Sequence, residues 1–488
     1  MKHSNLRNSI FYLIGLLGHD FFYFAFTLYI IKFITSALFT GADGHYTDTM
    51  VATISGAIVT IRVVELVLDP FLGALIDNTK SRFGRYKPWI MLGGVVCSSS
   101  FVLLFTTLGG TNLTHPVLYL CMFLVLFLIM DGSYSLYDIA MWSMIPAIST
   151  TYEERNRIGT VARLGAGIGQ ALLTIFVMPS IILGKNLFGS EQAGWLFFAI
   201  IVLVCTCLTA LLTCIGVKEH ESAIDTPNEK TKFTEVFSVI FKNDQLAWLA
   251  LPNWCYYFSL ALVSTLMTYY FQYVYGNAAS YSTIFGTATL VVVVSILFYP
   301  WLTRRFSRKQ VLFVALSVMI VSLAFFTFAG NNTVMVVIAS VLFLLPQPII
   351  FTSFLLELTD TIDYGQWKSG KRNASITLAV RPLLDKFAGA LSNGVVGLVA
   401  LVCGMTGAAS IADITSGNIV VFKTIMCGLP IALLLLSMFV YQKKFKLNTA
   451  FHAQIMKDLE QRAAEDRQDS AEGVEDKQPQ KTMVEQAI

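Results

Sequence analysis

Long apolar stretches alternate with short polar connections along almost the whole chain. About 20 apolar residues in a helix suffice to cross the hydrocarbon core of a bilayer, and these stretches reach or exceed that length. They lie at 10–37, 51–76, 88–110, 116–146, 158–184, 194–217, 245–274, 281–303, 310–329, 333–357, 373–402 and 419–441. The pattern therefore predicts an all-α membrane protein with about twelve transmembrane helices.

Composition leads to the same class. Hydrophobic residues make up 55% of the chain and charged residues only 13%, whereas a soluble domain carries about 25% charged residues. Such a chain cannot cover a water-facing surface with polar groups, so the lipid bilayer is the expected partner of its surface. We expect no nucleic-acid partner and either a monomer or a weak oligomer.

The connections between the apolar stretches alternate in charge. One set holds Lys185 as its single basic residue and comprises 38–50, 111–115, 185–193, 275–280, 330–332 and 403–418. The other set is rich in basic residues: Lys80, Arg82, Arg85, Lys87, Arg155, Arg157, Lys218, Lys230, Lys232, Lys242, Arg304, Arg305, Arg308, Lys309, Lys368, Lys371 and Arg372. Because basic connections stay in the cytoplasm, both termini are predicted to be cytoplasmic, in a bacterial inner membrane.

The longest internal connection, 218–244, divides the chain into two halves of similar length. A basic turn follows the second apolar stretch (Ser81 to Lys87) and another follows the eighth (Arg304 to Lys309), which suggests a weak internal repeat. Two six-helix bundles with a site between them are the layout of the major facilitator fold. The predicted domains are 1–217, the loop 218–244, the second bundle 245–442 and a cytoplasmic, partly disordered tail 443–488.

Three ionisable residues lie in the second apolar stretch. Arg62, Glu65 and Asp69 are spaced by three and four residues, so they share one helix face. Each would cost roughly 2.5–3.5 kcal/mol at the centre of a membrane, so this face cannot contact lipid. A purely structural ion network would pair Arg62 with one of the two acids and would leave the second acid without a partner. Oxygen ligands suit hard cations, so Glu65 and Asp69 are predicted to bind the coupling ion, H⁺ or Na⁺, with Arg62 supporting them.

The fourth stretch combines an acid with aromatic rings. Tyr134, Asp138 and Trp142 are four residues apart and stack on one helix face. A carboxylate accepts hydrogen bonds from sugar hydroxyls, and an aromatic ring covers the apolar face of a sugar. Trp142 alone would also suit a membrane interface. With Asp138 one turn away, we interpret the three residues as a sugar site.

Other charged residues lie at membrane depth. Among them are Asp20 in the first stretch, Asp131 in the fourth, Arg163 in the fifth, Arg381, Asp385 and Lys386 in the eleventh, and Lys423 near the outer end of the last. Arg381 and Asp385 are four residues apart, which favours a pair between them. Lys386 would then be the free cation facing the cavity.

Glycines at alternate positions, Gly165, Gly167 and Gly169, resemble half of a nucleotide-binding fingerprint. They lie within an apolar stretch, and no strand is expected before them. We interpret them as a site of close helix packing.

Several motifs together resemble the glycoside–pentoside–hexuronide:cation symporter family, in its melibiose-carrier-like form. The matching segments are Asp69-Pro70 through Asn78-Thr79-Lys80-Ser81-Arg82-Phe83-Gly84-Arg85-Tyr86-Lys87-Pro88-Trp89-Ile90, Asp138-x-x-x-Trp142-Ser143-x-x-Pro146, Asp360-Thr361-Ile362-Asp363-Tyr364-Gly365 followed by Lys368, and Gly18-His19-Asp20. The resemblance covers most of the chain and ends in the tail.

The resemblance implies sugar contacts at Asp20, Asp138, Trp142 and Arg163. It also implies a cation site at Glu65 and Asp69, with Lys386 between the two sites.

This chain departs from the melibiose carrier at three positions: Glu65 replaces Asp, His19 replaces Lys, and Phe351 replaces a second sugar-facing Trp. Because of the change at Glu65, the sequence does not decide whether the coupling ion is H⁺ or Na⁺. Because of the changes at His19 and Phe351, it does not decide whether the substrate is a galactoside.

The function predicted from these residues is secondary active import of a glycoside or oligosaccharide with H⁺ or Na⁺, by alternating access between two bundles. No covalent chemistry and no cofactor besides the coupling ion are expected, so the protein is predicted not to be an enzyme. One alternative is a hexuronide or pentoside symporter of the same family. Another is a sugar sensor that keeps the transporter fold; a membrane transferase would need a larger loop with catalytic groups.

Overall fold

The computed structural model describes residues 2–79, 81–148, 152–219, 243–295, 299–370, 374–406, 411–447 and 451–462. Within these ranges the secondary structure is helical, with no strand. The helices are α1 (Lys2–Ser36), α2 (Gly44–Asp77), α3 (Lys87–Leu104), α4 (Thr111–Thr114), α5 (Pro116–Ala147), α6 (Tyr152–Phe188), α7 (Glu191–Gly216), α9 (Asp244–Tyr269), η1 (Tyr270–Val274), η2 (Tyr281–Phe285), α10 (Gly286–Ser295), α11 (Tyr299–Arg305), α12 (Arg308–Ala329), α13 (Thr333–Leu344), α14 (Gln347–Ser369), α15 (Ala374–Val402), η4 (Ile411–Asp413), α16 (Ser416–Lys423), η5 (Thr424–Gly428) and α17 (Leu429–Lys444).

The helices match the apolar stretches of the sequence closely. In the described part of the chain, 11 helices are long and apolar enough to cross a membrane. The predicted span 281–303 is divided among η2, α10 and α11, and residues 296–298 within it lie outside the described ranges. The prediction of an all-α membrane protein of about twelve spans is therefore confirmed.

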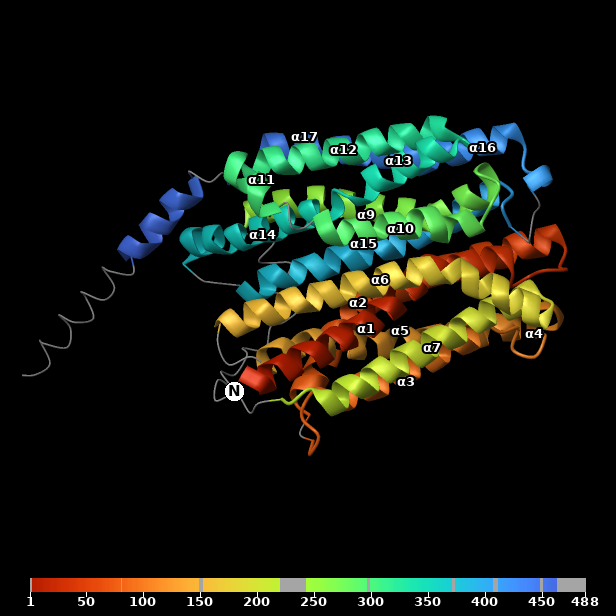
Figure 1. Ribbon diagram of the computed structural model, residues 1–488, viewed down its shortest axis with the longest axis horizontal. Helices are drawn as coiled ribbons and strands as arrows, with labels where there is room; N and C mark the ends of the chain where they lie inside the picture. The colour runs from red at the N-terminus through yellow and green to blue at the C-terminus, as the bar shows by residue number, and fades with distance from the viewer. Residues whose placement is uncertain are drawn as a thin grey trace, which may run out of the picture.

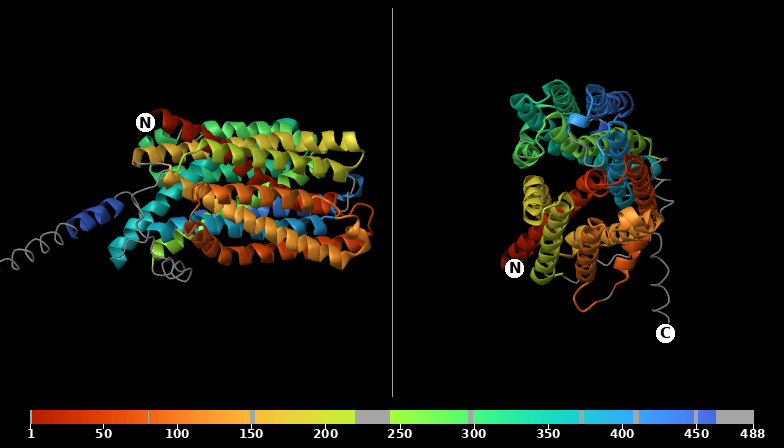
Figure 2. Two further views of the ribbon diagram at one scale, coloured as in Figure 1. Left: turned by 90° about the horizontal axis from the view of Figure 1, so that it is seen from below. Right: turned by 90° about the vertical axis from the view of Figure 1, so that its right-hand side faces the viewer.

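The long helices run side by side and form two bundles (Figures 1 and 2). In the first, α1 packs against α6 and α7, and α3 packs against α5 and α7. In the second, α9 packs against α15 and α17, and α12 against α13. The pairs α2 with α15 and α6 with α10 join the bundles. This arrangement places the face of α2 that carries the predicted cation site against the opposite bundle.

One end of the molecule carries the beginning of α1 and the segment 451–462; we call it the terminal end, and its opposite the far end (Figure 1). At the far end, hydrogen bonds connect the two bundles. They are Tyr29 to Tyr281 (2.9 Å), Thr35 to Tyr269 (2.5 Å), the Met178 amide to Ser282 (3.1 Å) and Thr406 to Asp48 (2.9 Å). The structure is therefore closed at the far end.

Two of the predicted domain boundaries border on segments outside the described residues. Most of the connecting loop, 220–242, lies outside them, as does 463–488 of the predicted tail. The described part of the tail is a helix, 451–462, which lies against α14. The Trp367 indole donates to Asp458 at 3.0 Å, and His452 Nε2 lies 3.1 Å from Asp363. These contacts anchor the start of the tail to the second bundle.

The glycines of α6 allow close approach to α1. A Cβ built on Gly165 would come within 2.5 Å of the Leu13 carbonyl oxygen, and one on Gly169 would overlap the Leu17 carbonyl oxygen. Contact between two backbones at this distance leaves no room for a side chain, as at other membrane helix crossings. For Gly165 and Gly169, the interpretation as packing residues therefore agrees with the structure.

Gly169→Ala is expected to lower the stability of the purified protein by roughly 1–3 kcal/mol, the usual cost of overpacking. Thermal unfolding in detergent measures this. The matched control is Gly132→Ala on α5, where an added Cβ meets nothing within 4 Å. Because Ala is a better helix former than Gly, the control should be neutral or slightly stabilising. Equal stability of Gly169→Ala and the wild type would contradict the close packing.

Candidate substrate and cation site

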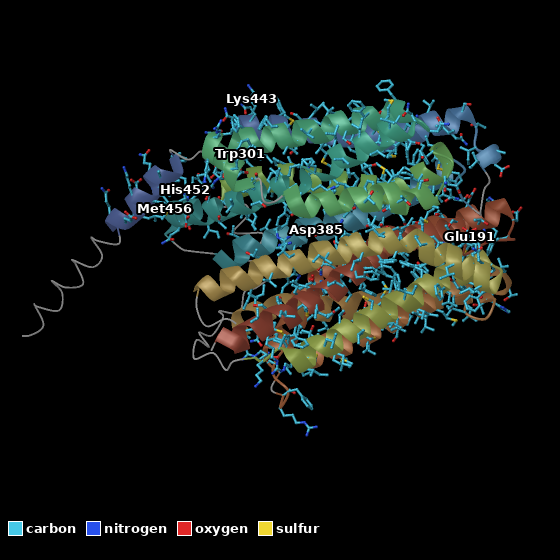
Figure 3. All side chains as sticks on the ribbon, in the orientation of Figure 1. Glu191, Trp301, Asp385, Lys443, His452 and Met456 are labelled. Carbon is cyan, nitrogen blue, oxygen red and sulfur yellow. The ribbon has the colours of Figure 1, made fainter. Side chains whose placement is uncertain are left out.

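The predicted site residues gather between the two bundles. Asp20, Asp138 and Arg163 come from α1, α5 and α6, and Phe351 and Asp385 come from α14 and α15. Figure 3 places Asp385 midway between the end that carries His452 and the end that carries Glu191. Residues from both halves therefore share one region about halfway along the helices, which corresponds to the depth at which alternating-access carriers hold their substrates.

His19 links the two carboxylates of the first bundle. Its Nδ1 lies 3.2 Å from Asp20 Oδ2, and its Nε2 lies 3.1 Å from Asp138 Oδ1. His19 is 2% exposed, whereas Asp138 is 22% exposed. The imidazole therefore lies between the two acids and contacts one oxygen of each, which leaves their other oxygens open to a ligand. From the sequence, His19 was given as part of the Gly18-His19-Asp20 segment and as a departure from the melibiose carrier but was assigned no role, although a histidine beside an acid in an apolar helix was a usable signal.

Tyr134 was predicted to line the sugar site, but in the structure its ring is buried. It is only 4% exposed. Its ring stacks against His19 at 5.5 Å, Phe22 at 5.6 Å and Tyr23 at 5.8 Å between centroids. Ring stacking of this kind holds α1 against α5. Tyr134 thus supports His19, and its predicted contact with the substrate is not supported by this geometry.

Two guanidinium groups from opposite bundles lie beside aromatic rings. Arg163 lies 4.3 Å from the centroid of Phe351 and 5.0 Å from that of Trp142. Arg381 lies 5.3 Å from the same Phe351 ring. Cation–π contacts of this length are attractive. Phe351 therefore brings the predicted residues Arg163 and Arg381 together.

The expected pair between Arg381 and Asp385 is not formed. No ion pair within 4.0 Å joins them, and neither residue forms an ion pair elsewhere in the described ranges. Tyr257 of α9 lies against Arg381 and was not predicted. A spacing of four residues on a helix allows this pair, but contacts with Phe351 and Tyr257 hold the Arg381 guanidinium away from the Asp385 carboxylate.

Lys386 is not the free cation that the sequence suggested. Its Nζ donates to Asp69 Oδ2 at 2.5 Å and to Glu65 Oε1 at 3.0 Å. These ion pairs cross from α15 to α2 and therefore join the two bundles. The predicted cation site thus holds the lysine ammonium between its two carboxylates.

Further polar groups surround these acids. The Ser135 hydroxyl donates to Glu65, and Lys386 Nζ lies 3.2 Å from Ser135 Oγ. Asp131, one turn earlier on α5 and 1% exposed, lies beside Glu65. Neither Asp131 nor Ser135 was in the predicted site, although their spacing of four on an apolar helix was visible in the sequence.

Arg62 lies near this cluster but is held differently. Its guanidinium sits 4.0 Å from the centroid of Phe26, and its Nε and Nη2 have no hydrogen-bond partner among the described residues. It therefore contributes positive charge to the acids without bonding to them through these two atoms. This agrees with a supporting role and not with a direct ligand.

The donor set around Glu65 and Asp69 is oxygen-rich. No cluster of three or more His, Cys, Asp and Glu residues arranged for a metal occurs in the described ranges. Na⁺ would therefore need hydroxyl oxygen such as that of Ser135 beside the two carboxylates, as hard cations accept. A proton would need only one carboxylate oxygen.

Comparison with known proteins places the chain in a family. The model of the family described as MFS/sugar transport protein matches residues 11–449. This chain belongs to the MFS/sugar transport family. The carrier is 38% identical to the lactose permease of Lactobacillus delbrueckii subsp. bulgaricus, over 94% of this chain and 73% of the relative. It is likewise 38% identical to the raffinose carrier protein of Pediococcus pentosaceus, over 92% of this chain and 71% of the relative. A putative sulfoquinovose importer of Escherichia coli (strain K12) is 25% identical, over 94% of both proteins.

Solved structures show the same fold. The carrier superimposes on the D-xylose-proton symporter with a TM-score of 0.62 at 12% identity, over 91% of this chain and 98% of the other. The nucleoside transporter NupG gives 0.56 at 14% identity, over 91% and 99%. These structures confirm the major facilitator fold, and the family match with the permease relatives supports the predicted sugar:cation symporter in place of an enzyme. The identity of the cation stays a prediction.

Proposed function

We propose that the carrier imports a neutral glycoside or oligosaccharide together with H⁺ or Na⁺, across a bacterial inner membrane with both termini in the cytoplasm. The observation that carries the coupling is the position of Lys386 between Glu65 and Asp69. Na⁺ bound by both carboxylates, or H⁺ bound by one of them, competes with the Lys386 ammonium for their negative charge. A cation arriving at Glu65 and Asp69 therefore weakens the ion pairs that join α2 to α15 and favours release of Lys386.

Breaking these pairs links ion binding to movement. The bundles are held together at this depth by the contacts of Lys386 and at the far end by hydrogen bonds. Release of Lys386 lowers the cost of separating α15 from α2, and the freed ammonium can turn toward the sugar region. The ion thus biases the equilibrium between the two arrangements of the bundles, as a ligand with different affinities for two states must.

The charges of the sugar region favour an uncharged substrate. With Lys386 held by α2, the region contains the guanidinium groups of Arg163 and Arg381. Three carboxylates, Asp20, Asp138 and Asp385, oppose them. No excess of positive charge remains among these described residues to attract an acid. The lactose permease and the raffinose carrier at 38% identity support the same substrate class.

An acidic glycoside is the second candidate. Arg163 and Arg381 both lie beside Phe351, and two guanidinium groups in one place suit a carboxylate or sulfonate. The putative sulfoquinovose importers are more distant relatives, at 25% and 26% identity.

The double variant Arg381→Leu with Asp385→Leu separates the two candidates. Each single change shifts the net charge of the region by one unit, and the double change restores the net charge of the wild type. For a neutral substrate, the double variant should transport better than either single variant. Initial uptake rates of one neutral and one acidic glycoside measure this. The acidic substrate class would be established by two results together. The wild type would transport the acidic glycoside faster than the neutral one, and the double variant would lose transport of the acidic glycoside.

The function itself is tested in sealed vesicles. A panel of labelled glycosides is offered with an imposed pH gradient and, separately, with an imposed Na⁺ gradient. We expect at least one neutral glycoside to accumulate with one of the two gradients. The accumulation should disappear when that gradient is collapsed. Absence of uptake of every sugar under both gradients, with binding retained, would favour a sensor that keeps the transporter fold.

A further inference from the structure

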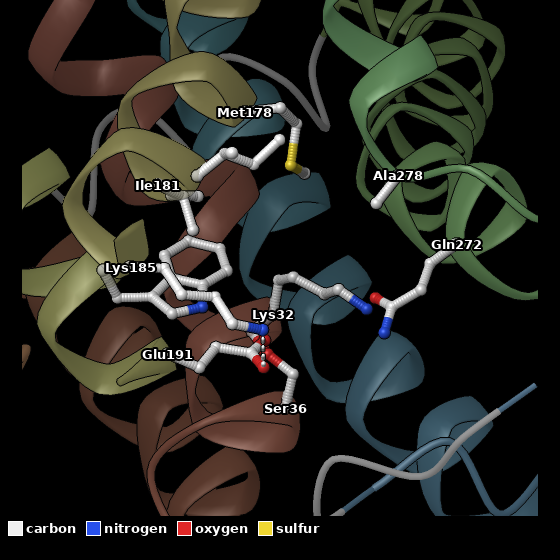
Figure 4. A pocket seen from close by; sticks show the side chains of 10 residues that line it. Lys32, Ser36, Met178, Ile181, Lys185, Glu191, Gln272 and Ala278 are labelled. Carbon is white, nitrogen blue, oxygen red and sulfur yellow. Dashed lines mark hydrogen bonds and ion pairs between the residues drawn. The ribbon is translucent and has the colours of Figure 1, made fainter. Parts of the chain in front are cut away.

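A cavity lies at the far end of the molecule, away from the sugar region. Its volume is about 240 Å³, and residues of α1, α6, α7 and η1 surround it (Figure 4). Its polar lining consists of Lys32, Ser36, Lys185, Glu191, Trp195 and Gln272. Since a water molecule occupies about 30 Å³, the cavity has room for a small solute with part of its hydration.

Lys32 is the unusual residue of this cavity. It is 2% exposed, and its Nζ has no hydrogen-bond partner in the described ranges. Its ammonium lies instead over the rings of Tyr269, at 3.7 Å, and Tyr273, at 5.0 Å. Cation–π contacts offset part of the loss of hydration, but the three N–H donors of an ammonium remain without acceptors among the described residues. To keep its charge, a buried ammonium in this state needs an acceptor or a counterion.

The neighbouring acid does not serve as that counterion. Glu191 pairs with Lys185 at 3.9 Å, as the dashed line in Figure 4 marks, and no ion pair within 4.0 Å joins it to Lys32. The Ser36 hydroxyl donates to the Lys32 carbonyl oxygen at 2.6 Å. With two lysines and one glutamate, the lining has an excess of positive charge.

Other groups at the cavity can donate hydrogen bonds. In Figure 4 the Gln272 side chain, from the opposite bundle, faces the Lys32 ammonium with its amide oxygen, and its amide nitrogen lies beside it as a donor. The buried Nε1 of Trp195 also has no hydrogen-bond partner in the described ranges. An ammonium, an amide and an indole N–H in one cavity form a surrounding suited to a negatively charged ligand.

We propose that this cavity binds a small monovalent anion, either chloride or a short carboxylate, between Lys32 of one bundle and Gln272 of the other. The anion replaces the acceptors that Lys32 lacks. Because Lys32 contacts Tyr269 and Tyr273 of the second bundle, a bound anion stabilises the arrangement that is closed at the far end. The inference concerns a site separate from the sugar and coupling-ion residues and does not depend on which sugar is carried.

Thermal unfolding of the purified, full-length carrier tests the site. Sodium is held constant while chloride or acetate replaces methanesulfonate, which is bulkier and a weaker acceptor. The midpoint of unfolding should rise with chloride, with acetate or with both, and should saturate. Whichever ion gives the larger shift identifies the anion. The line width of ³⁵Cl in nuclear magnetic resonance, measured with increasing acetate as competitor, provides a direct reading of binding.

Lys32→Met should remove the anion-dependent shift and the competitive broadening. Gln272→Leu, which changes no charge, should weaken both. The control is Lys423→Met, since Lys423 also lies in a spanning helix but donates to the Thr327 carbonyl oxygen and does not line the cavity. It should keep the wild-type response.

An equal response to all three anions in the wild type would overturn the proposal. So would a saturable response that survives in both Lys32→Met and Gln272→Leu. Gln272→Leu keeps the test decisive if Lys32→Met does not fold. Because these measurements need no sugar and no ion gradient, their failure is distinct from a failure of the proposed transport function.

Discussion

Asp69→Asn is expected to abolish gradient-driven sugar accumulation while leaving sugar exchange partly intact. One charge moving through 100 mV releases about 2.3 kcal/mol, which corresponds to a concentration ratio of roughly 50. The variant should accumulate sugar to a ratio of about 1, the value expected without coupling to the gradient. The physical reason is the position of Asp69, which is 2.5 Å from Lys386 and forms one side of the carboxylate pair that the ion is proposed to occupy. An amide can neither take the proton nor neutralise the ammonium.

Vesicles with an imposed gradient give the accumulation ratio, and vesicles preloaded with unlabelled sugar give the exchange rate. The control is Asp43→Asn, which removes a carboxylate from an exposed turn at the far end, where its Oδ2 accepts from the His45 amide at 3.2 Å. The control should accumulate sugar like the wild type. If Asp69→Asn also does so, Asp69 is not part of the ion site.

Asp138→Ala is expected to lower sugar affinity at least ~100-fold. A hydrogen bond to a charged group contributes about 1.5–3 kcal/mol, and a carboxylate can accept two from one sugar. The change also deprives His19 Nε2 of its neighbour at 3.1 Å, so the imidazole loses part of what orients it toward Asp20. Equilibrium binding of a labelled glycoside to the purified carrier in detergent measures the effect.

Trp142→Tyr is the milder comparison for this experiment. A tyrosine ring is smaller than an indole but still offers an apolar face to a sugar and a π-face to Arg163. Its affinity should fall less than that of Asp138→Ala. An unchanged affinity in Asp138→Ala would show that the sugar binds elsewhere.

The spans, the fold class and the positions of the buried charges could be predicted without the structure. A bilayer rejects unpaired backbone groups and isolated charges so strongly that long apolar runs must be helices. For the same reason, ionisable residues such as Glu65, Asp69 and Asp138 must face the interior of the bundle. Helical spacing then shows which residues share a face, and this put Glu65 and Asp69 together correctly.

The residues that these buried charges contact on other helices could not be predicted in this way. Asp69 and Lys386 are 317 positions apart in the chain, and the periodicity of one helix does not determine which helix its polar face meets. The rotation of α15 brings Lys386 to α2, and the packing of Phe351 between two bundles separates Arg381 from Asp385.

The same limit applies to burial and to the far-end cavity. Tyr134 shares a helix face with Asp138, yet α1 covers its ring because His19 and Tyr23 pack against it. Lys32 lies in the first apolar stretch, where its position near the end of a span gives no sign of a special role. Only the meeting of α1 with Tyr269 and Tyr273 buries its ammonium. Local sequence determines which groups must avoid lipid, and the packing of distant helices decides which groups they meet instead.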